Sequence, residues 1–233
     1  MKIAHIISLK QLGGVQKNFI EFYNSLTDNQ KKYHIVFTIG RVSSRYKGNN
    51  NFLSIYNLSN FLFLLKVLKS KKYIKHFYNN IGNVKIYYLF LFFKPIKIIF
   101  HERGVSWNID PKYSYRYKFL FNLADYIIAN SKATKFLLIN KFKLSEYENK
   151  IIVIYNGINI KKNNKLFKKI KSNNFVVGFL GRFETPKGIH VLISAAKYLS
   201  KYNDIEFRFT GSGSMKEYLI KQSLNYPNIY IEN

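Results

Sequence analysis

Short apolar runs alternate with helix-like segments along almost the whole chain, and this alternation restricts the fold more than any other feature of the sequence. Continuous apolar runs are typical of buried strands, and apolar residues three or four positions apart are typical of helices. We predict strands at residues 3–8, 34–39, 97–101, 126–130, 151–155, 175–180, 206–210 and 229–231. We predict helices at residues 15–26, 54–78, 112–123, 132–142, 188–201 and 215–222. This βαβα order predicts an α/β protein with doubly wound, mainly parallel sheets.

A charged and polar segment, KKNNKLFKKIKSNN at residues 161–174, interrupts the alternation before it starts again. A segment of this composition is typical of a linker or of an exposed helix between domains. We therefore predict a first Rossmann-like domain at residues 1–160, a linker at residues 161–173 and a second domain at residues 174–233. The second domain is predicted to be incomplete, because a Rossmann-like domain normally contains more strands than this segment offers.

The net charge of the chain also differs strongly before and after this segment. The 233 residues have a net charge of +26, but residues 174–233 hold only seven basic and five acidic residues. Residues 1–173 therefore carry a net charge of +24. A positive field of this size attracts an anionic partner, such as a membrane surface, a charged lipid or nucleic acid. A compositional bias without function is the alternative, but a global bias does not explain why the charge is confined to one part.

Other features of the composition exclude classes of protein and of site. The chain has no cysteine, so it can form neither disulfide bonds nor thiolate metal sites. Its longest uninterrupted apolar run, residues 86–93, is too short for a membrane-spanning helix, which needs about 20 residues. The N-terminus lacks the apolar region and the cleavage site of a signal peptide. We expect a cytoplasmic protein, bound peripherally at the inner face of the cytoplasmic membrane.

The stretch GFLGRFETPKG at residues 178–188 follows a predicted strand and precedes a predicted helix. Ligands of open α/β sheets bind at this edge, where the N-terminus of a helix attracts anions. Arg182 offers a bidentate fork and Lys187 a point charge, while Gly181 and Gly188 allow the backbone to approach a ligand. Together these residues predict a diphosphate site. An ordinary turn with solvated charges is the alternative.

Two pairs of glycines occupy similar positions elsewhere. Gly211 and Gly213 follow the next strand of the second domain, and Gly13 and Gly14 follow the first strand of the chain. A tight turn would also explain each pair, but their places after strands favour contacts with a phosphate, sugar or nucleoside. Gly13 and Gly14 are not part of a GxGxxG motif, and no acidic residue follows the second strand of the chain, so a nicotinamide cofactor is not expected.

Three ionisable residues, His101, Glu102 and Arg103, stand at the end of the predicted strand 97–101. His101 is suited to hydrogen bonding with a sugar hydroxyl or a phosphate, and we predict it as the catalytic residue. We predict that Glu102 and Arg103 bind the acceptor, the molecule to which a sugar would be transferred. A structural role is the alternative for a single histidine at a strand end. Ser131 is predicted to cap a helix, and Asn156 and Gly157 to form a turn.

Motifs of several other enzyme classes are missing from the sequence. It contains no Asp-x-Asp pair for a metal-bound nucleotide and no GxxxxGK[ST], HExxH or GxSxG. We therefore expect no metal ion and no cofactor.

In their order along the chain, these motifs resemble those of retaining glycosyltransferases of the GT-B fold, in the group called family 4 or group 1. The resemblance covers nearly the whole chain, and its last three motifs are specific in order and spacing. The matching stretches are LGGVQK (12–17), HERG (101–104), ADYIIANS (124–131), VIYNGIN (153–159), GFLGRFETPKG (178–188) and FTGSGSMKEYL (209–219).

The resemblance implies two Rossmann-like domains, of which the first mainly binds the acceptor and the second a nucleotide-sugar donor. It implies that Arg182 and Lys187 bind the donor diphosphate. The pair Gly13 and Gly14 is then expected near that diphosphate, and the pair Gly211 and Gly213 near the nucleoside. It also implies that His101 lies close to the transferred sugar.

One departure from the family pattern affects the second domain. Family members carry a Glu-x7-Glu motif well after the Gly-x-Gly region, and this sequence ends at IYIEN before that point. Glu232 is no substitute, because it comes too early and has no partner after it. We therefore expect a donor domain that is truncated.

The sequence thus predicts a glycosyltransferase that moves a sugar from a nucleoside diphosphate to an anionic or lipid-linked acceptor, in the synthesis of cell-surface polysaccharide or glycolipid. An inactive truncated remnant is one alternative. A basic protein that binds an anionic membrane or nucleic acid is another. Nucleic acid is the less favoured partner, because the basic residues are dispersed and no nucleic-acid-binding motif is present.

Overall fold

The computed structural model describes residues 2–9, 13–39, 42, 52–55, 57–70, 72–78, 97–103, 109–157 and 173–232. The chain divides into two units, Met1–Asn164 (unit 1) and Lys165–Asn233 (unit 2). Apart from Asn173, the predicted linker lies outside the described residues, as does the apolar run at residues 86–93.

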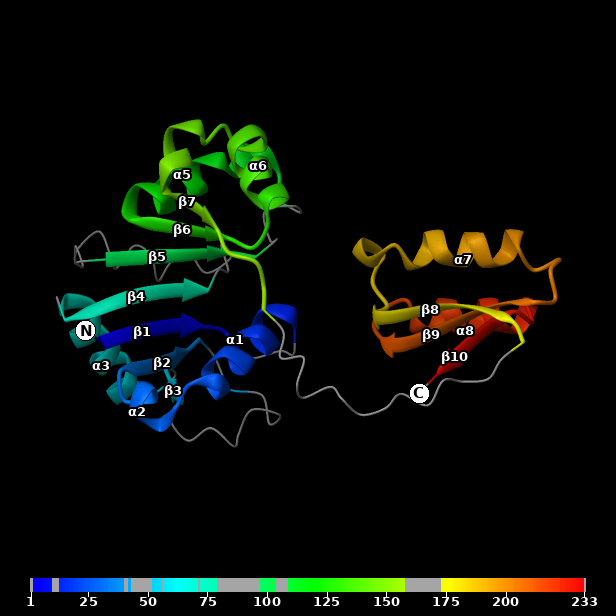
Figure 1. The fold of residues 1–233 in the computed structure, drawn as a ribbon, viewed down its shortest axis with the longest axis horizontal. Coiled ribbons are helices and arrows are strands. Elements are labelled where there is room, and N and C mark those ends of the chain that lie inside the picture. Colours follow the sequence, from blue (N-terminus) through cyan, green and yellow to red (C-terminus); the bar gives the residue numbers. More distant parts are fainter. Residues whose placement is uncertain are drawn as a thin grey trace. The chain divides into compact units, whose positions relative to one another are not determined.

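Unit 1 contains a parallel sheet of seven strands in the order β3-β2-β1-β4-β5-β6-β7 (Figure 1). The order reverses between β1 and β4, and open α/β sheets bind their ligands beside such a reversal. The sheet confirms the predicted α/β class. Its strands are β1 (Lys2–Ile7), β2 (His34–Thr38), β3 (Phe52–Ser54), β4 (Tyr73–Tyr78), β5 (Lys97–Glu102), β6 (Tyr126–Ala129) and β7 (Ile151–Val153).

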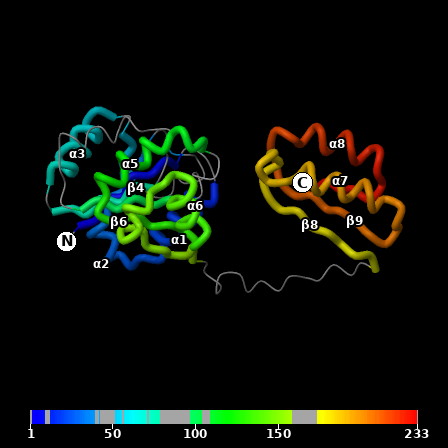
Figure 2. Tube along the Cα trace, turned by 90° about the horizontal axis from the view of Figure 1, so that it is seen from above, coloured from blue at the N-terminus to red at the C-terminus, as the bar shows by residue number. Residues whose placement is uncertain are grey.

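Helices cover the two faces of this sheet unequally. Figure 2 shows α3 and α5 on one side of the sheet and α1 and α2 on the other. The larger apolar core packs α3, α5 and α6 against one face, where Ala4 and Ile6 of β1 point. On the opposite face, Phe19 of α1 packs against Ile7 of β1 in a smaller cluster. The helices are α1 (Gly14–Ser25), α2 (Asp28–Lys31), α3 (Leu58–Lys69), α5 (Ser114–Leu123) and α6 (Lys132–Lys141), with 3-10 turns at Pro111–Tyr113 and Ser145–Lys150.

The predicted helix at residues 54–78 is wrong at both ends. Ser54 closes the short strand β3, and Tyr73–Tyr78 forms β4 in the middle of the sheet. Lys75 and His76 interrupt the apolar run of β4, so the sequence does not have the pattern of a buried strand. Lys75 is nevertheless buried, and its Nζ donates a hydrogen bond to the Ser70 carbonyl oxygen at 2.6 Å, just after α3. Burial lowers the pKa of Lys75 to about 8.

Unit 2 is a smaller parallel sheet of three strands in the order β10-β9-β8. Its elements are β8 (Phe175–Arg182), a 3-10 turn (Thr185–Lys187), α7 (Ile189–Tyr198), β9 (Ile205–Ser212), α8 (Lys216–Asn225) and β10 (Ile229–Glu232). The two helices and the strands enclose a core that includes Phe183, Phe209 and Leu219. Strand β8 stands at an edge of this sheet and exposes Leu180 to 85%.

Two glycines allow the loops after β8 and β9 to touch. Gly211 has φ +151° and Gly213 has φ +154°, values that other residues rarely adopt. A Cβ atom on Gly211 would overlap the carbonyl oxygen of Gly181, and one on Gly213 would lie 2.5 Å from the carbonyl oxygen of Phe183. Packing within unit 2 therefore requires glycine at both positions.

We predict that Gly211→Ala destabilises unit 2 by about 2 kcal/mol or more, because it adds both backbone strain and an overlap with Gly181. Thermal unfolding followed by circular dichroism measures the effect. Gly178→Ala in β8 is the matched control, since its Cβ would meet nothing within 4 Å. Equal melting temperatures for the two variants would contradict the packing role.

Candidate functional site

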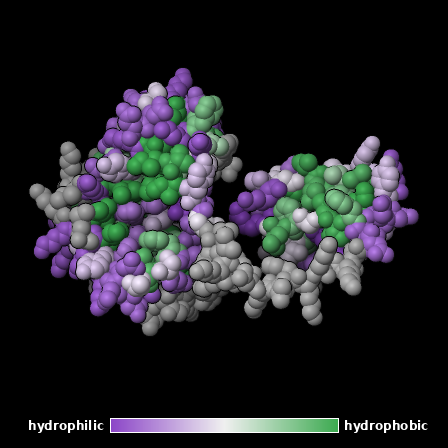
Figure 3. All heavy atoms as spheres, in the orientation of Figure 1, coloured by the Kyte–Doolittle hydropathy of each residue, from purple (hydrophilic) through white to green (hydrophobic). Residues whose placement is uncertain are grey.

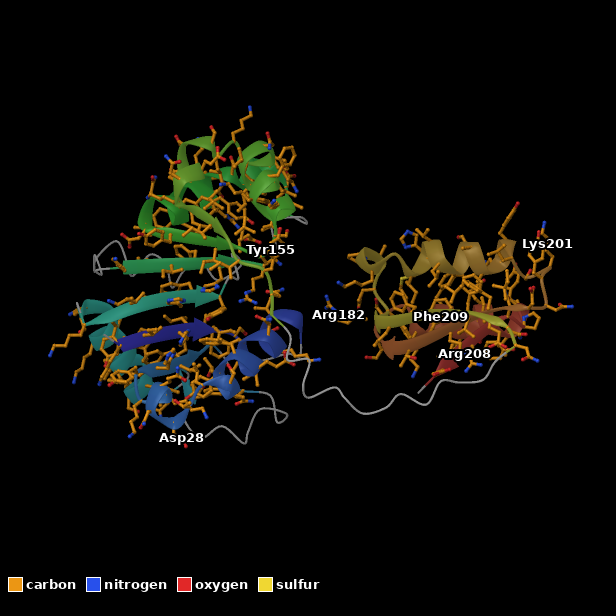
Figure 4. The ribbon with its side chains drawn as sticks, viewed as in Figure 1. Asp28, Tyr155, Arg182, Lys201, Arg208 and Phe209 are labelled. Atoms are coloured by element: carbon orange, nitrogen blue, oxygen red, sulfur yellow. The ribbon has the colours of Figure 1, made fainter. Side chains whose placement is uncertain are left out.

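The two residues of unit 2 that are predicted to bind a diphosphate lie beside the carboxyl end of β8. Arg182 is the last residue of the strand, and Figure 4 shows it at the opposite end of unit 2 from Lys201. Lys187 ends the 3-10 turn that follows. Both side chains are exposed, and neither has an ion-pair or hydrogen-bond partner among the described residues. Two exposed cations at one loop are suited to binding an anion, although Arg182 also interacts electrostatically with Glu184 of the same loop.

The N-terminus of α7 adds to this arrangement. Gly188 precedes the helix in the left-handed conformation, with φ +72° and ψ 15°. As a glycine it has no side chain with which to cap the free N–H groups of the first turn. An uncapped helix N-terminus next to two cations is a favourable place for a phosphate group.

Glu184 fixes the loop after β8 to the loop after β9. Its carboxylate accepts hydrogen bonds from Ser214 Oγ at 2.8 Å and from Ser214 N at 3.2 Å. The side-chain bond and then the backbone bond lower the pKa of Glu184. Met215 N also donates to the Phe183 carbonyl oxygen at 2.9 Å. Sequence reasoning missed Glu184 and Ser214, since only proximity in space gives them a role.

The glycines of unit 1 begin helix α1. Gly13 is its N-cap residue and Gly14 its first residue. A Cβ on Gly14 would meet no atom within 4 Å, so packing within the described residues does not require a glycine there. The preceding Leu12 of the LGGVQK motif lies outside the described residues.

Unit 1 contains a pocket of about 700 Å³ on the face of the sheet that carries α1. Its lining comes from β1, α1, β2, β4, β5, β6 and the segment after β7. The lining side chains include His5, Asn18, Phe22, His34, His76, Tyr78, His101, Arg103, Ile128, Ile154 and Asn156. Tyr155, labelled in Figure 4, also borders the pocket, just after β7.

Four of the five histidines of the chain form a row across the floor of this pocket. They come from four adjacent strands, and the register places His5 of β1 opposite His76 of β4. The imidazole nitrogens pair with one another, His5 Nε2 with His34 Nδ1 at 2.8 Å and His76 Nδ1 with His101 Nε2 at 3.0 Å. A hydrogen bond of 3.3 Å links His5 Nδ1 to the Tyr78 hydroxyl.

Burial keeps these imidazoles neutral. Burial is the main cause of the lowered pKa of all four, and it brings that of His76 to about 4. The neighbouring histidines lower the pKa values of His5, His76 and His101 further. His101 is buried, and its Nδ1 has no hydrogen-bond partner among the residues that the structure describes. The predicted catalytic histidine is therefore an uncharged group, and one of its nitrogens already binds His76.

Arg103 lies at one end of the pocket, directly after β5. Its Nη1 donates to Asn18 Oδ1 of α1 at 2.7 Å and to Asn156 Oδ1 after β7 at 3.0 Å. Its guanidinium lies over the ring of Tyr78, 5.5 Å from the centroid. Asn18 in turn donates from Nδ2 to the Gly157 carbonyl oxygen at 3.2 Å. The residues predicted as a turn after β7 thus help to orient Arg103.

The structure separates Glu102 from the other two residues of its motif. His101 and Arg103 line the pocket, whereas Glu102 is buried and does not line it. Successive side chains of a strand point to opposite faces, so Glu102 points away from the pocket. The fourth residue of the motif, Gly104, lies outside the described residues. Ser131 caps α6 as predicted, accepting a hydrogen bond from Thr134 N at 3.0 Å.

Neither a metal site nor a membrane-spanning helix is present in the part of the chain that the structure describes. In the described part of the chain, no group of three or more histidine or acidic side chains is placed to hold a metal ion. None of the helices within the described ranges is both long and apolar enough to cross a membrane.

We predict that unit 1 loses stability as the pH falls from about 6.5 toward 4, because its histidines take up protons only after unfolding. The loss is up to about 1.4 kcal/mol per pH unit for each such histidine. Urea unfolding at several pH values measures it. His76→Gln should make the dependence less steep, while His190→Gln, on an exposed residue of α7, should leave it unchanged. Equal slopes in both variants would contradict the role of the histidine row.

Comparison with known proteins gives matches over both units. Residues 23–162 match the family model described as Glycosyltransferase Family 4, and residues 160–229 match the model described as Glycosyl transferases group 1. The chain is 30% identical to the capsular polysaccharide biosynthesis glycosyltransferase CapM of Staphylococcus aureus over 240 residues, which is 91% of this chain and 61% of CapM. It is 32% identical to the uncharacterized glycosyltransferase MJ1069 of Methanocaldococcus jannaschii, over 58% of this chain and 38% of that protein.

Solved structures share the fold at low sequence identity. Anabaena HepE, crystallised with UDP and glucose, matches with a TM-score of 0.68 at 17% identity, over 99% of this chain and 68% of HepE. The lipopolysaccharide outer core galactosyltransferase WaaB matches with a TM-score of 0.64 at 15% identity, over 99% of this chain and 67% of WaaB. The first family model covers more than half of the chain. By these matches and by its two α/β units, the chain belongs to glycosyltransferase family 4.

Proposed function

We propose that this protein takes part in the transfer of a sugar from a nucleoside diphosphate to an acceptor, in the synthesis of a cell-surface polysaccharide or glycolipid. CapM, whose name places it in capsular polysaccharide biosynthesis, supports this class of product. The chain spans 61% of the length of CapM. A glycosyltransferase activity like that of the whole relative is therefore a proposal for this chain.

The arrangement of Arg182, Lys187 and the N-terminus of α7 in unit 2 is the observation that carries the proposal. In such a transfer the bond between the sugar and the diphosphate breaks, and negative charge develops on the leaving diphosphate. Exposed cations and free backbone N–H groups stabilise that charge. The solved structure of HepE with UDP and glucose supports a uridine nucleotide as the first one to test.

We propose the pocket of unit 1 as the acceptor side of the reaction, with His101 and Arg103 as its polar groups. Being neutral, His101 acts as a hydrogen-bonding group rather than as a cation. Its catalytic role stays a prediction, as does retention of configuration at the sugar, which rests on the family resemblance. The role of Gly14 in donor binding likewise stays a prediction that rests on the family resemblance.

We also propose that unit 1 binds the membrane surface through helix α3. Leu58, Leu62, Lys66 and Lys69 recur at intervals of three or four residues, so they share one face of the helix. Leu58 is 70% exposed and Leu62 51% exposed. Apolar side chains combined with lysines are typical of helices that lie in the interface of an anionic membrane. The net charge of +24 on residues 1–173 also favours binding to an anionic membrane.

We predict that Lys187→Ala weakens the binding of UDP to the full chain by about 10- to 100-fold, because a charge-assisted contact with the diphosphate is lost. Isothermal titration calorimetry measures the affinity. Lys201→Ala removes the same charge at the other end of unit 2 and should bind UDP like the unchanged protein. Unchanged affinity in Lys187→Ala would refute the donor assignment.

We predict that the protein sediments with vesicles rich in phosphatidylglycerol and that 0.5 M salt releases about half or more of it, since the attraction is screened. The double variant Leu58→Ser/Leu62→Ser should bind the vesicles several-fold less, by about the loss of two apolar side chains. Leu224→Ser, at an 81% exposed site in unit 2, is the control. Equal binding of the α3 variant and the control would contradict the assignment of α3, and tighter binding to nucleic acid than to vesicles would favour the alternative function.

A further inference from the structure

Glu184 lies between the two exposed cations of the loop after β8. It follows Arg182 by two positions and precedes Lys187 by three, directly before the 3-10 turn Thr185–Lys187. Backbone hydrogen bonds of 2.9 Å connect it to both cations, from Glu184 N to the Arg182 carbonyl oxygen and from Lys187 N to the Glu184 carbonyl oxygen. A carboxylate at this place is able to neutralise the positive charge on which an anion site depends.

The spacing of Glu184 and Lys187 favours an ion pair. Side chains three residues apart lie above one another in a 3-10 turn, and opposite charges at this spacing attract each other. None of the ion pairs among the described residues includes Glu184 or Lys187. Another group therefore holds the carboxylate away from the lysine.

That group is Ser214, in the loop after β9. Each carboxylate oxygen of Glu184 accepts one hydrogen bond from it, Oε2 from Ser214 Oγ at 2.8 Å and Oε1 from Ser214 N at 3.2 Å. These two bonds lower the pKa of Glu184 more than the charge of Arg182 does. Ser214 also lies just before the N-terminus of α8, where a negative charge is favoured.

The loop lies on a polar surface, where water competes with every hydrogen bond. Figure 3 shows hydrophilic side chains at the end of unit 2 where Figure 4 labels Arg182. Arg182, Lys187 and Ser214 are exposed, and Glu184 is partly exposed. Hydrogen bonds rather than burial thus determine where the carboxylate points. Loss of one of them should allow the side chain to turn toward a cation.

We propose that Ser214 keeps the carboxylate of Glu184 away from Lys187, so that the lysine stays available to a diphosphate. Glu184 and Ser214 are then positioning residues. They contribute no cation to the site, but they decide whether the charge of Lys187 is already compensated when the ligand arrives. The inference rests on the proposed function, in that the diphosphate is that of the donor. The surroundings of Lys187 can nevertheless be measured without any nucleotide.

Calorimetry with UDP on the full chain measures the effect on binding. Ser214→Ala removes the shorter hydrogen bond, and we expect the freed carboxylate to pair with Lys187 and to weaken UDP binding about threefold or more. Glu184→Gln removes a negative charge beside the diphosphate and should tighten binding about twofold. The double variant Ser214→Ala/Glu184→Gln should recover the affinity lost in Ser214→Ala, because no carboxylate is left to compete.

The double variant separates this role from that of a simple anchor between two loops. If Glu184 and Ser214 were only an anchor, each single change would weaken UDP binding and the double variant would bind no better than Ser214→Ala. That result would overturn the proposal.

Two matched changes in unit 2 serve as controls. Ser223→Ala removes a hydroxyl that donates to the Ile220 carbonyl oxygen within α8, and Asp204→Asn removes an exposed carboxylate just before β9. Both should bind UDP like the unchanged protein. If Asp204→Asn tightened binding as much as Glu184→Gln, net charge alone would explain the gain, and the proposal would be overturned.

The reactivity of Lys187 toward acetic anhydride reports on its surroundings in the absence of nucleotide. An amine reacts in its uncharged form, and a carboxylate partner favours the charged form. By mass spectrometry at about pH 8, we expect Lys187 to react about twofold or more slowly in Ser214→Ala and at the original rate in the double variant. Lys201, at the other end of unit 2, is the internal control. An unchanged rate for Lys187 in Ser214→Ala would contradict the proposal.

The two readouts distinguish a failure of this proposal from a failure of the donor assignment. If UDP does not bind but the acetylation of Lys187 follows the expected pattern, the donor assignment fails and the restraint of Glu184 stands. If UDP binding depends on Lys187 but Ser214→Ala changes neither binding nor acetylation, the restraint of Glu184 fails alone.

Discussion

Successive side chains of a strand point to opposite faces of a sheet, and the organisation of unit 1 depends on this constraint. In β1, Ala4 and Ile6 enter the large core while His5 enters the pocket. In β5, the same alternation buries Phe100 in the core and brings His101 and Arg103 to the other side. The same strands thus form the apolar core on one face and the row of neutral histidines on the other. Helix α1 covers part of this second face and gives the pocket one of its walls.

The fold class could be predicted from the sequence because strands and helices alternate with clear periodicity. The loop with Arg182 and Lys187 was also predictable, since its position follows from one strand and one helix. The row of histidines was not, because it depends on the register of four strands. One of these, β4, was hidden by Lys75 and His76, which look unsuited to a buried strand. Glu102 was assigned to the site because it lies between His101 and Arg103 in the sequence. Its side chain, however, points to the face of the sheet opposite the pocket.

The loops of unit 2 show how a packing requirement and a binding function can share residues. Gly211 and Gly213 let the loop after β9 lie against Gly181 and Phe183, and Glu184 fixes the contact through Ser214. The loop that carries the two exposed cations is thereby attached to a second loop. A rigid loop loses less conformational entropy when it binds an anion. The same glycines would therefore matter to affinity even without touching the ligand.

The burial of Lys75 has a consequence for how the protein is handled. Its pKa of about 8 is lower than the value of 10.5 for a free lysine, so the unfolded chain binds more protons between these values. The free energy of unfolding then rises with pH across this range. Purification and concentration of the protein are accordingly best begun in a mildly alkaline buffer.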